Sequence, residues 1–280
     1  MEKNVLTLPG GLSLSYIEGG SGHPLVMLPG WSQTASGFAA QFGAFSKVAR
    51  VIAVDHRGHG DSENAPAGYR IQRLARDLDE FLAVMGLGSF DLLGHSMGCS
   101  VIWSYMSMFG RARAPRKIVL ADQAPAVVAQ ADWTEQQIAD AGCLFPSFDA
   151  LNGFEQAVRG AETPDAHKEL IRGMFSAETH DGVLNQIASE NLKLPRAHAA
   201  HLLHDHCVLD WRTEIQQIRV PTLVIGGEAS IFSAQSQRWI ASQIPGAQVE
   251  IFEADQGGSH FMFVNNPERF NARVAAFLSA

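Results

Sequence analysis

Residues 92–105 read LLGHSMGCSVIWSY, and this stretch decides the fold of the chain. An apolar, strand-like run ends at Gly94, a single serine stands between two glycines, and a second apolar run compatible with a helix follows. Small residues two positions on either side of a serine let a strand and a helix pass closely at a sharp turn, which holds the hydroxyl above a sheet at a helix N-terminus. The pattern predicts that Ser96 is a nucleophile at the end of a buried strand.

Other short apolar runs do not alternate with polar residues, as expected for strands buried on both faces of a parallel sheet. An alternating stretch at 4–17, around Pro9-Gly10-Gly11, indicates a hairpin instead. Segments with helical periodicity lie between the apolar runs, for example at 71–86. Strands that alternate with helices predict an α/β protein with a doubly wound sheet. The apolar runs stand at 25–28, 51–54, 91–93, 117–120, 222–225 and 249–252.

The alternation of strands and helices stops between about residues 126 and 212. This stretch contains several segments of helical character and no convincing strand, and a structureless loop of that length is implausible in a compact domain. We therefore expect a helical cap at 126–212 over the C-terminal edge of the sheet. It would divide the core into a first part, 1–125, and a second part, 213–280.

Composition and charge exclude several classes of protein. The chain has 280 residues, 46% hydrophobic and 18% charged, with a net charge of -8 and no block of Lys and Arg. Nucleic acid and an anionic membrane surface are therefore not expected as partners. The 3 cysteines are widely spaced, and no apolar run approaches the ~18 residues of a membrane span. The default expectation is a cytoplasmic protein that acts on a small molecule, with its oligomeric state left open.

A serine hydroxyl needs a base within reach, and His260 stands in a suitable place among the 11 histidines. It follows the last predicted strand through a loop with Gly257-Gly258 just before it, from which a histidine can return to the nucleophile. Four other histidines lie close together in one segment of the expected cap. Their spacing indicates a solvated helix rather than a metal site, and a contact of one of them with the substrate is also possible. They are His198, His201, His204 and His206.

The ordered set of motifs resembles the α/β-hydrolase fold, and within it the capped esterases, lactonases and cofactor-free haloperoxidase-like perhydrolases. The resemblance covers nearly the whole chain and is weakest in the expected cap. It implies a mostly parallel sheet of eight strands and a reaction that requires neither a metal nor an organic cofactor. The motifs are LVMLPGW from residue 25, VIAVDHRGHGDS from 51, LLGHSMG from 92, VPTLVIGG from 220 and GGSH from 257.

The acidic partner of the histidine is where the chain departs from the commonest pattern of this family. That pattern places an aspartate shortly after the strand at 222–225, where this chain has Ser230. A minority of α/β-hydrolases carry the acid one strand earlier, where KIVLAD ends in Asp122. We assign Asp122, because the acid must lie near His260 to hold the imidazole and stabilise its cation. Glu228 and Asp255 remain alternatives, and Asp122 could instead cap its strand.

The oxyanion hole is expected to use the backbone N–H of Met97, which follows the nucleophile. The resemblance places a second N–H on Trp31, in the loop that reads Pro29-Gly30-Trp31.

The aromatic residues of the expected cap could line a hydrophobic substrate pocket, and they could equally pack the cap onto the core. The candidates for the substrate pocket are Trp31, Gln33, His95, Trp133, Phe145 and Phe175.

The leading hypothesis is a serine hydrolase that cleaves a small or medium hydrophobic carboxylic ester or lactone through an acyl-enzyme. The alternative is a cofactor-independent dioxygenase of a hydroxyquinolone-type heteroaromatic, which this chain resembles at LPGW and at ARAPRKIVLAD. Those enzymes carry a histidine two residues after the tryptophan, where this chain has Gln33. A third hypothesis is a receptor that binds a ligand without turnover, because the fold does not fix the function.

Overall fold

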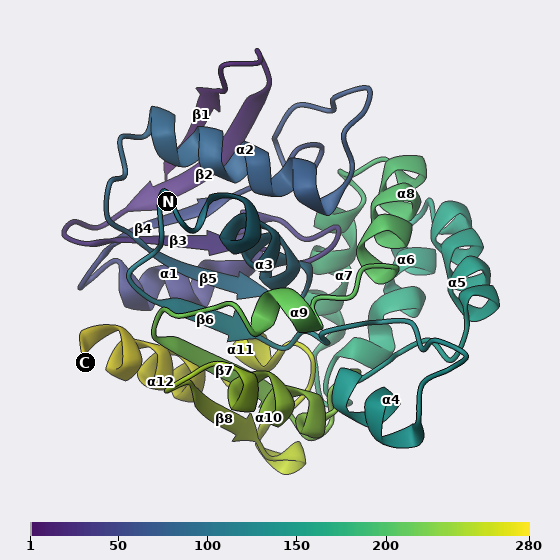
Figure 1. Cartoon of the computed structure of the whole chain (residues 1–280). Coiled ribbons are helices and arrows are strands. Elements are labelled where there is room, and N and C mark those ends of the chain that lie inside the picture. Colours follow the sequence, from purple (N-terminus) through teal and green to yellow (C-terminus); the bar gives the residue numbers. More distant parts are fainter. Residues whose placement is uncertain (1) are drawn as a thin grey trace.

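Eight strands form one sheet in the computed structural model of the chain, which describes residues 2–280 (Figure 1). They are β1 (Glu2–Thr7), β2 (Ser13–Gly19), β3 (Pro24–Leu28), β4 (Arg50–Val54), β5 (Asp91–His95), β6 (Ile118–Ala121), β7 (Thr222–Gly227) and β8 (Gln248–Phe252). Their order across the sheet is β1-β2-β4-β3-β5-β6-β7-β8. β1 and β2 form the predicted hairpin, β2 is also antiparallel to β4, and the remaining neighbours are parallel. The predicted doubly wound, mostly parallel sheet is confirmed.

Helices flank this sheet and follow the predicted periodicity. The helix expected at 71–86 is observed at Ile71–Val84, and Ile71, Leu74, Leu78 and Leu82 are buried as its spacing predicts. The short 3-10 helices are η1 (Ala35–Phe38), η2 (Arg172–Met174) and η3 (Ala254–Gln256). The α-helices are α1 (Ala39–Phe45), α2 (Ile71–Val84), α3 (Met97–Phe109), α4 (Glu135–Ala141), α5 (Phe148–Gly160), α6 (Pro164–Ile171), α7 (Asp181–Asn191), α8 (Arg196–Cys207), α9 (Arg212–Ile215), α10 (Ala234–Gln243), α11 (Met262–Asn265) and α12 (Pro267–Ser279).

The sheet separates two hydrophobic cores because successive strand residues point to opposite faces. Val26 and Leu92 belong to the core that contains α2, α3 and α10, whereas Met27 and Leu93 belong to the core that contains α1 and α12. All four side chains are fully buried, and burying one such side chain contributes about 1.5–3 kcal/mol. Burial on both faces explains why the strands are continuous apolar runs in the sequence.

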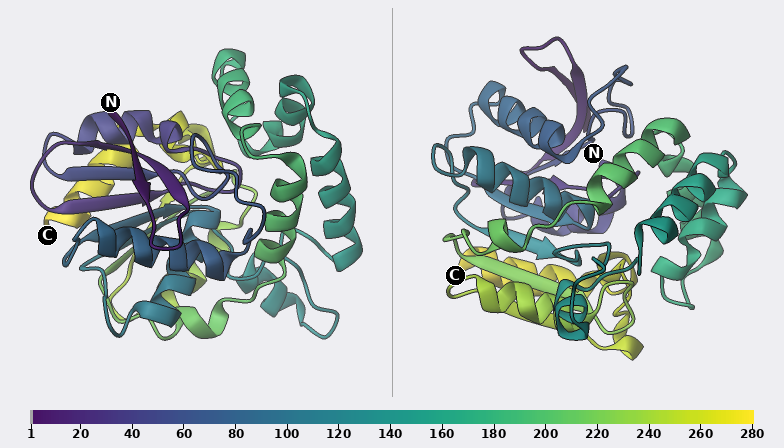
Figure 2. Two further views of the ribbon diagram at one scale, coloured as in Figure 1. Left: turned by 90° about the horizontal axis from the view of Figure 1, so that it is seen from above. Right: turned by 45° about the vertical axis from the view of Figure 1, so that its right-hand side comes forward.

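The helical segments predicted within 126–212 are observed as α4 to α8. Figure 2 shows α5, α6, α7 and α8 gathered on one side of the molecule, beside the sheet. α5 packs against α8, and an isolated antiparallel bridge between Ala126 and Asp210 joins the two ends of the segment. The proposed division into core and cap at 126 and 212 stays a prediction.

The loop at 55–62, which carries the DHRGHGDS motif, holds neighbouring loops in place. Asp55 Oδ1 accepts a hydrogen bond from the Ala35 N–H at 2.7 Å, and His59 Nε2 accepts one from the Ser32 N–H at 3.2 Å. The buried Arg57 forms an ion pair with Asp77 of α2 at 2.6 Å. The motif thereby fixes the segment that follows Trp31. Of the helices described within residues 2–280, none is long and apolar enough to cross a bilayer.

Candidate active site

Ser96 stands at the corner between β5 and α3 with a strained backbone, at φ 53° and ψ -126°. Positive φ in a non-glycine residue stores energy and persists only where surrounding contacts enforce it. The flanking glycines permit the corner sterically. A Cβ on Gly94 would come within 2.6 Å of the Gly98 carbonyl carbon, and a Cβ on Gly98 within 2.3 Å of the Leu28 carbonyl oxygen. The strand, the helix and the loop after β3 therefore approach closely only because both positions are glycine.

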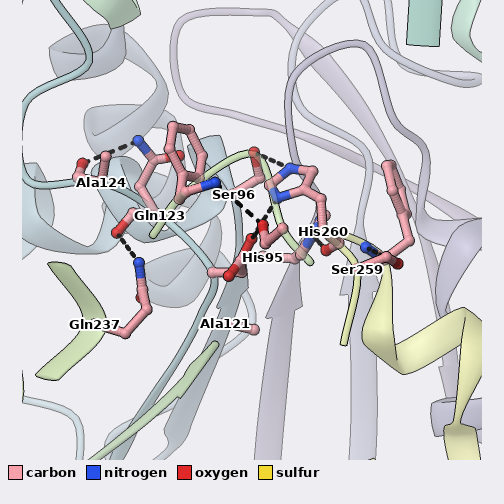
Figure 3. Close-up of polar contacts among 12 residues, drawn as sticks. His95, Ser96, Ala121, Gln123, Ala124, Gln237, Ser259 and His260 are labelled. Atoms are coloured by element: carbon pink, nitrogen blue, oxygen red, sulfur yellow. Dashed lines mark hydrogen bonds and ion pairs between the residues drawn. The ribbon is translucent and has the colours of Figure 1, made fainter. Parts of the chain in front are cut away.

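His260 reaches this corner from the loop after β8, and Figure 3 shows it beside Ser96. Its Nε2 atom lies 3.0 Å from the Ser96 Oγ atom. Its Nδ1 atom lies 2.6 Å from Asp122 Oδ2, at the end of β6, where the backbone also has a positive φ of 55°. His260 is 2% exposed and Asp122 is fully buried, so both contacts are shielded from water. The structure thus brings together the three side chains that the sequence singled out.

Burial sets the protonation of this group. It lowers the pKa of His260, which favours a neutral imidazole that can accept the serine proton. Burial also raises the pKa of Asp122, while hydrogen bonds from the Ser230 hydroxyl and the Gly227 N–H oppose that rise by stabilising the anion. The Ser230 hydroxyl donates directly to Asp122 Oδ2, the oxygen that also contacts His260.

Ser230 was not among the predicted site residues. It occupies the position at which the commonest family pattern has the acid, and here it supports the acid supplied by β6. The rival carboxylates lie elsewhere. Glu228 is exposed and accepts from the Ala254 N–H at 3.4 Å, and Asp255 is exposed in η3. Of the three carboxylates considered from the sequence, Asp122 is the one that contacts His260.

A family model described as "Alpha/beta hydrolase family" matches residues 25–273. The chain belongs to the α/β-hydrolase family. A non-heme chloroperoxidase from Kitasatospora aureofaciens is 28% identical over 98% of this chain and 99% of its own.

Solved structures show the same fold. An esterase from Exiguobacterium antarcticum aligns with this α/β-hydrolase at a TM-score of 0.88 and 22% identity, over 100% of both chains. The enol-lactonase from Burkholderia xenovorans aligns at a TM-score of 0.82 and 22% identity, over 99% of this chain and 100% of its own.

The two expected oxyanion donors of this α/β-hydrolase adjoin the corner. Met97 is the first residue of α3, so its N–H has no acceptor within the helix. Trp31 lies in the loop after β3, and a Cβ on its neighbour Gly30 would come within 3.0 Å of the Ser96 Cβ atom. The Trp31 indole Nε1 donates to the Ala199 carbonyl of α8 at 2.7 Å, which ties this loop to α8.

A cavity of about 50 Å³ lies against Ser96 and His260. Of the predicted pocket residues, Trp31, Gln33 and Phe145 line it. Gln33 also lines a neighbouring cavity of about 200 Å³, on the side of α1 and α7. The segment 126–212 supplies a mainly apolar wall, which consists of Val127, Leu144, Phe145, Phe154, Met174 and Leu203, together with His206 and Cys207. The sequence left a substrate contact by His206 as an open possibility. In the structure, His206 lies in this wall.

The structure places the other three predicted pocket residues away from this cavity. His95 lies within hydrogen-bond distance of Gln33 Oε1 at 3.0 Å and of the His260 carbonyl at 2.9 Å. The Trp133 ring lies 3.9 Å from the Arg212 guanidinium carbon, and Phe175 stacks on Phe261 at 3.9 Å between ring centroids. Trp133 therefore packs on Arg212 of α9, and Phe175 packs on the buried core residue Phe261. Within residues 2–280 no group of three His, Cys, Asp or Glu residues is arranged to hold a metal ion.

Proposed function

We propose that this α/β-hydrolase is a serine hydrolase that cleaves a small carboxylic ester or lactone. The observation that carries the proposal is the buried hydrogen-bonded chain from Ser96 through His260 to Asp122. A hydroxyl becomes an effective nucleophile when a base takes its proton and a third group orients that base. Both contacts lie within hydrogen-bond distance, and the serine borders a cavity.

In the first half of the reaction, the Ser96 oxygen attacks the substrate carbonyl and His260 Nε2 takes the serine proton. Asp122 holds the imidazole through Nδ1–H and stabilises the cation that forms. The carbonyl oxygen becomes negative, and the N–H groups of Met97 and Trp31 stabilise it. One such donor typically accounts for about 10²–10³ in turnover. The tetrahedral intermediate then collapses, the bond to the leaving oxygen breaks, and His260 returns the proton to that oxygen.

In the second half, water takes the place of the leaving group. His260 Nε2 removes a proton from the water, whose oxygen attacks the acyl-serine carbonyl, and the bond to the Ser96 oxygen breaks as that oxygen regains a proton. The free acid leaves and the resting hydrogen bonds are restored. A lactone follows the same steps and yields one hydroxy acid.

The size and lining of the cavity support a compact acyl group. Its volume of about 50 Å³ is smaller than the ~150 Å³ apolar cavity that accepts benzene. An acetyl group suits this space best. A five-membered lactone has as many non-hydrogen atoms as benzene and needs the cavity to widen, and the fused bicyclic ring of the hydroxyquinolone dioxygenase hypothesis needs it to widen further.

A panel of 4-nitrophenyl esters from acetate to octanoate, together with five-membered lactones, tests the proposal. We expect the wild type to prefer the shortest acyl chains, Ser96→Ala to lose turnover, and Ser107→Ala to match the wild type. Ser107 is a matched control, because it is an exposed serine on the same helix, α3. A folded wild type that hydrolyses no ester or lactone would contradict the proposal. Oxygen uptake with a hydroxyquinolone would then indicate the dioxygenase, and binding without turnover would indicate the receptor.

A further inference from the structure

His206 lies at the end of α8 and lines the cavity that also borders Ser96 and His260. Only 5% of the residue is exposed to solvent. The proposed hydrolysis does not use it, since the proton transfer is complete with His260 and Asp122. A buried, titratable side chain beside the reacting group therefore has no assigned role.

The surroundings of His206 make its polarity unusual. Apart from the Cys207 thiol, the other side chains that 126–212 contributes to this wall are apolar. The indole N–H of Trp31, on the core side, already donates to a backbone carbonyl. His206 is thus the one imidazole or amide that α4 to α8 and their connecting loops contribute to the lining of this cavity, while Gln33 contributes an amide from the core side.

The hydrogen-bonding capacity of His206 is not satisfied by the protein. Its Nδ1 atom is buried and has no hydrogen-bond partner within residues 2–280. Leaving a buried polar atom unpaired costs about 1–3 kcal/mol, so such an atom in a native site calls for a partner. Burial, and secondarily the nearby His260, lowers the pKa of His206 to about 4, so the ring is neutral and offers one donor and one acceptor.

We propose that His206 is a specificity-determining residue that hydrogen-bonds a hydroxyl group of the substrate. A hydroxyl both donates and accepts, so it pairs with a neutral imidazole whichever nitrogen carries the proton. The inference rests on the proposed hydrolase function and narrows it to small hydroxy esters or hydroxy lactones, with the hydroxyl near the reacting carbonyl. The apolar wall accommodates the carbon chain, and the imidazole selects the oxygen.

Matched substrate pairs test this inference. The pairs are 4-nitrophenyl butanoate against its 2-hydroxy and 3-hydroxy analogues, and γ-butyrolactone against its α-hydroxy analogue, each corrected for spontaneous hydrolysis. We expect the wild type to show at least about a tenfold higher kcat/KM for the best hydroxyl-bearing member of a pair. That ratio corresponds to the free energy of about one hydrogen bond made away from water. His206→Phe should bring that ratio to about one, and His206→Leu repeats the test with a smaller side chain if the first variant does not fold.

The ratio within each pair distinguishes recognition from a structural role, because a loosened cavity slows both members together. His201→Ala is the control, since His201 is an exposed histidine on the same helix, and we expect it to keep the wild-type ratio. A wild type without preference for any hydroxyl-bearing member, or an unchanged preference in the His206 variants, would overturn the inference and leave the hydrolase proposal intact. A wild type that hydrolyses no member of any pair would overturn both.

Discussion

The corner at Ser96 and the helices of 126–212 contribute to the same cavity in different ways. At the corner, backbone sterics fix the geometry, because the close approach of Gly94 and Gly98 to their neighbours leaves no room for a Cβ. The segment 126–212 contributes side chains such as Phe145, which precedes α5 and packs on Phe154 of that helix, and His206 of α8. Their positions depend on how α5 and α8 pack together. The difference teaches that the proposed chemistry depends on the strand ends, whereas the substrate selection that we propose depends on the segment 126–212. The predictions below test this separation.

The largest effect is expected when the histidine at the corner is replaced, and a histidine on α8 serves as the comparison. We expect His260→Ala to lower kcat/KM by about 10⁴-fold or more, because removal of the base disables the nucleophile. His201→Ala should remain close to the wild type, since His201 is exposed. Steady-state kinetics with the best ester measures both. Equal losses in the two variants would mean that α8 takes part in the chemistry, and the separation would fail.

The second prediction concerns the acid at the end of β6. Asp122→Asn should keep the fold but lower kcat/KM by about 10³–10⁴-fold, because the amide no longer stabilises the imidazolium. Glu228→Gln should stay within about twofold of the wild type, since Glu228 is exposed and does not contact His260. Thermal unfolding checks that both variants fold. The reverse ranking would move the acid to the loop after β7.

The third prediction concerns the hydroxyl that supports this acid. Ser230→Ala removes a hydrogen bond that lowers the pKa of Asp122, so the carboxylate becomes harder to ionise. We expect kcat/KM to fall about tenfold, and its acidic limb to move to higher pH, because the active form needs an anionic Asp122. A pH profile of kcat/KM measures the shift. A profile that keeps the wild-type limb would show that Ser230 does not tune the acid.

The wild-type profile carries a related expectation. Because burial lowers the pKa of His260, the neutral base persists below the ordinary histidine value of about 6.5. The acidic limb of the wild type should therefore report protonation of Asp122, whose pKa burial raises, rather than protonation of His260. A wild-type limb that Ser230→Ala leaves in place would contradict this, because that variant acts on Asp122 and not on His260.

The smallest effect is expected in the helical segment. Phe145→Ala enlarges the cavity and should move the preferred acyl chain to longer esters, with a change of about two- to tenfold in relative kcat/KM. Phe148→Ala is the control, because that side chain is 44% exposed and does not line the cavity. An unchanged chain-length profile in Phe145→Ala would show that this wall does not select the substrate.

The sequence predicted the corner well because its requirements are local and steric. Ser96 lies between glycines that a sharp turn demands, and His260 follows the last strand at a position that the topology sends back to the same edge. The fold followed from runs buried on both faces of the sheet. The assignment of Asp122 combined the resemblance, in which a minority of members carry the acid after this strand, with the rule that parallel strands end at one edge.

The segment 126–212 was harder to predict because no motif fixes how its helices and the loops between them pack. Trp133 and Phe175 lie just outside its helices, before α4 and after η2. Trp133 and Phe175 were reasonable pocket candidates by composition, yet tertiary packing directs them onto Arg212 and Phe261. The position of Ser230 against Asp122 was also missed, although the missing aspartate at that point in the pattern was a signal. The sequence showed that a position departed from the family, and the structure shows what the substitute contacts.

Labelling with a fluorophosphonate probe, read by intact mass and peptide mapping, tests the central claim most directly. The claim is that the buried chain from Asp122 through His260 activates Ser96. The account predicts a single adduct on Ser96 in the wild type and in Ser107→Ala, none in Ser96→Ala, and much slower labelling in His260→Ala. A folded wild type that acquires no adduct on Ser96 would contradict it.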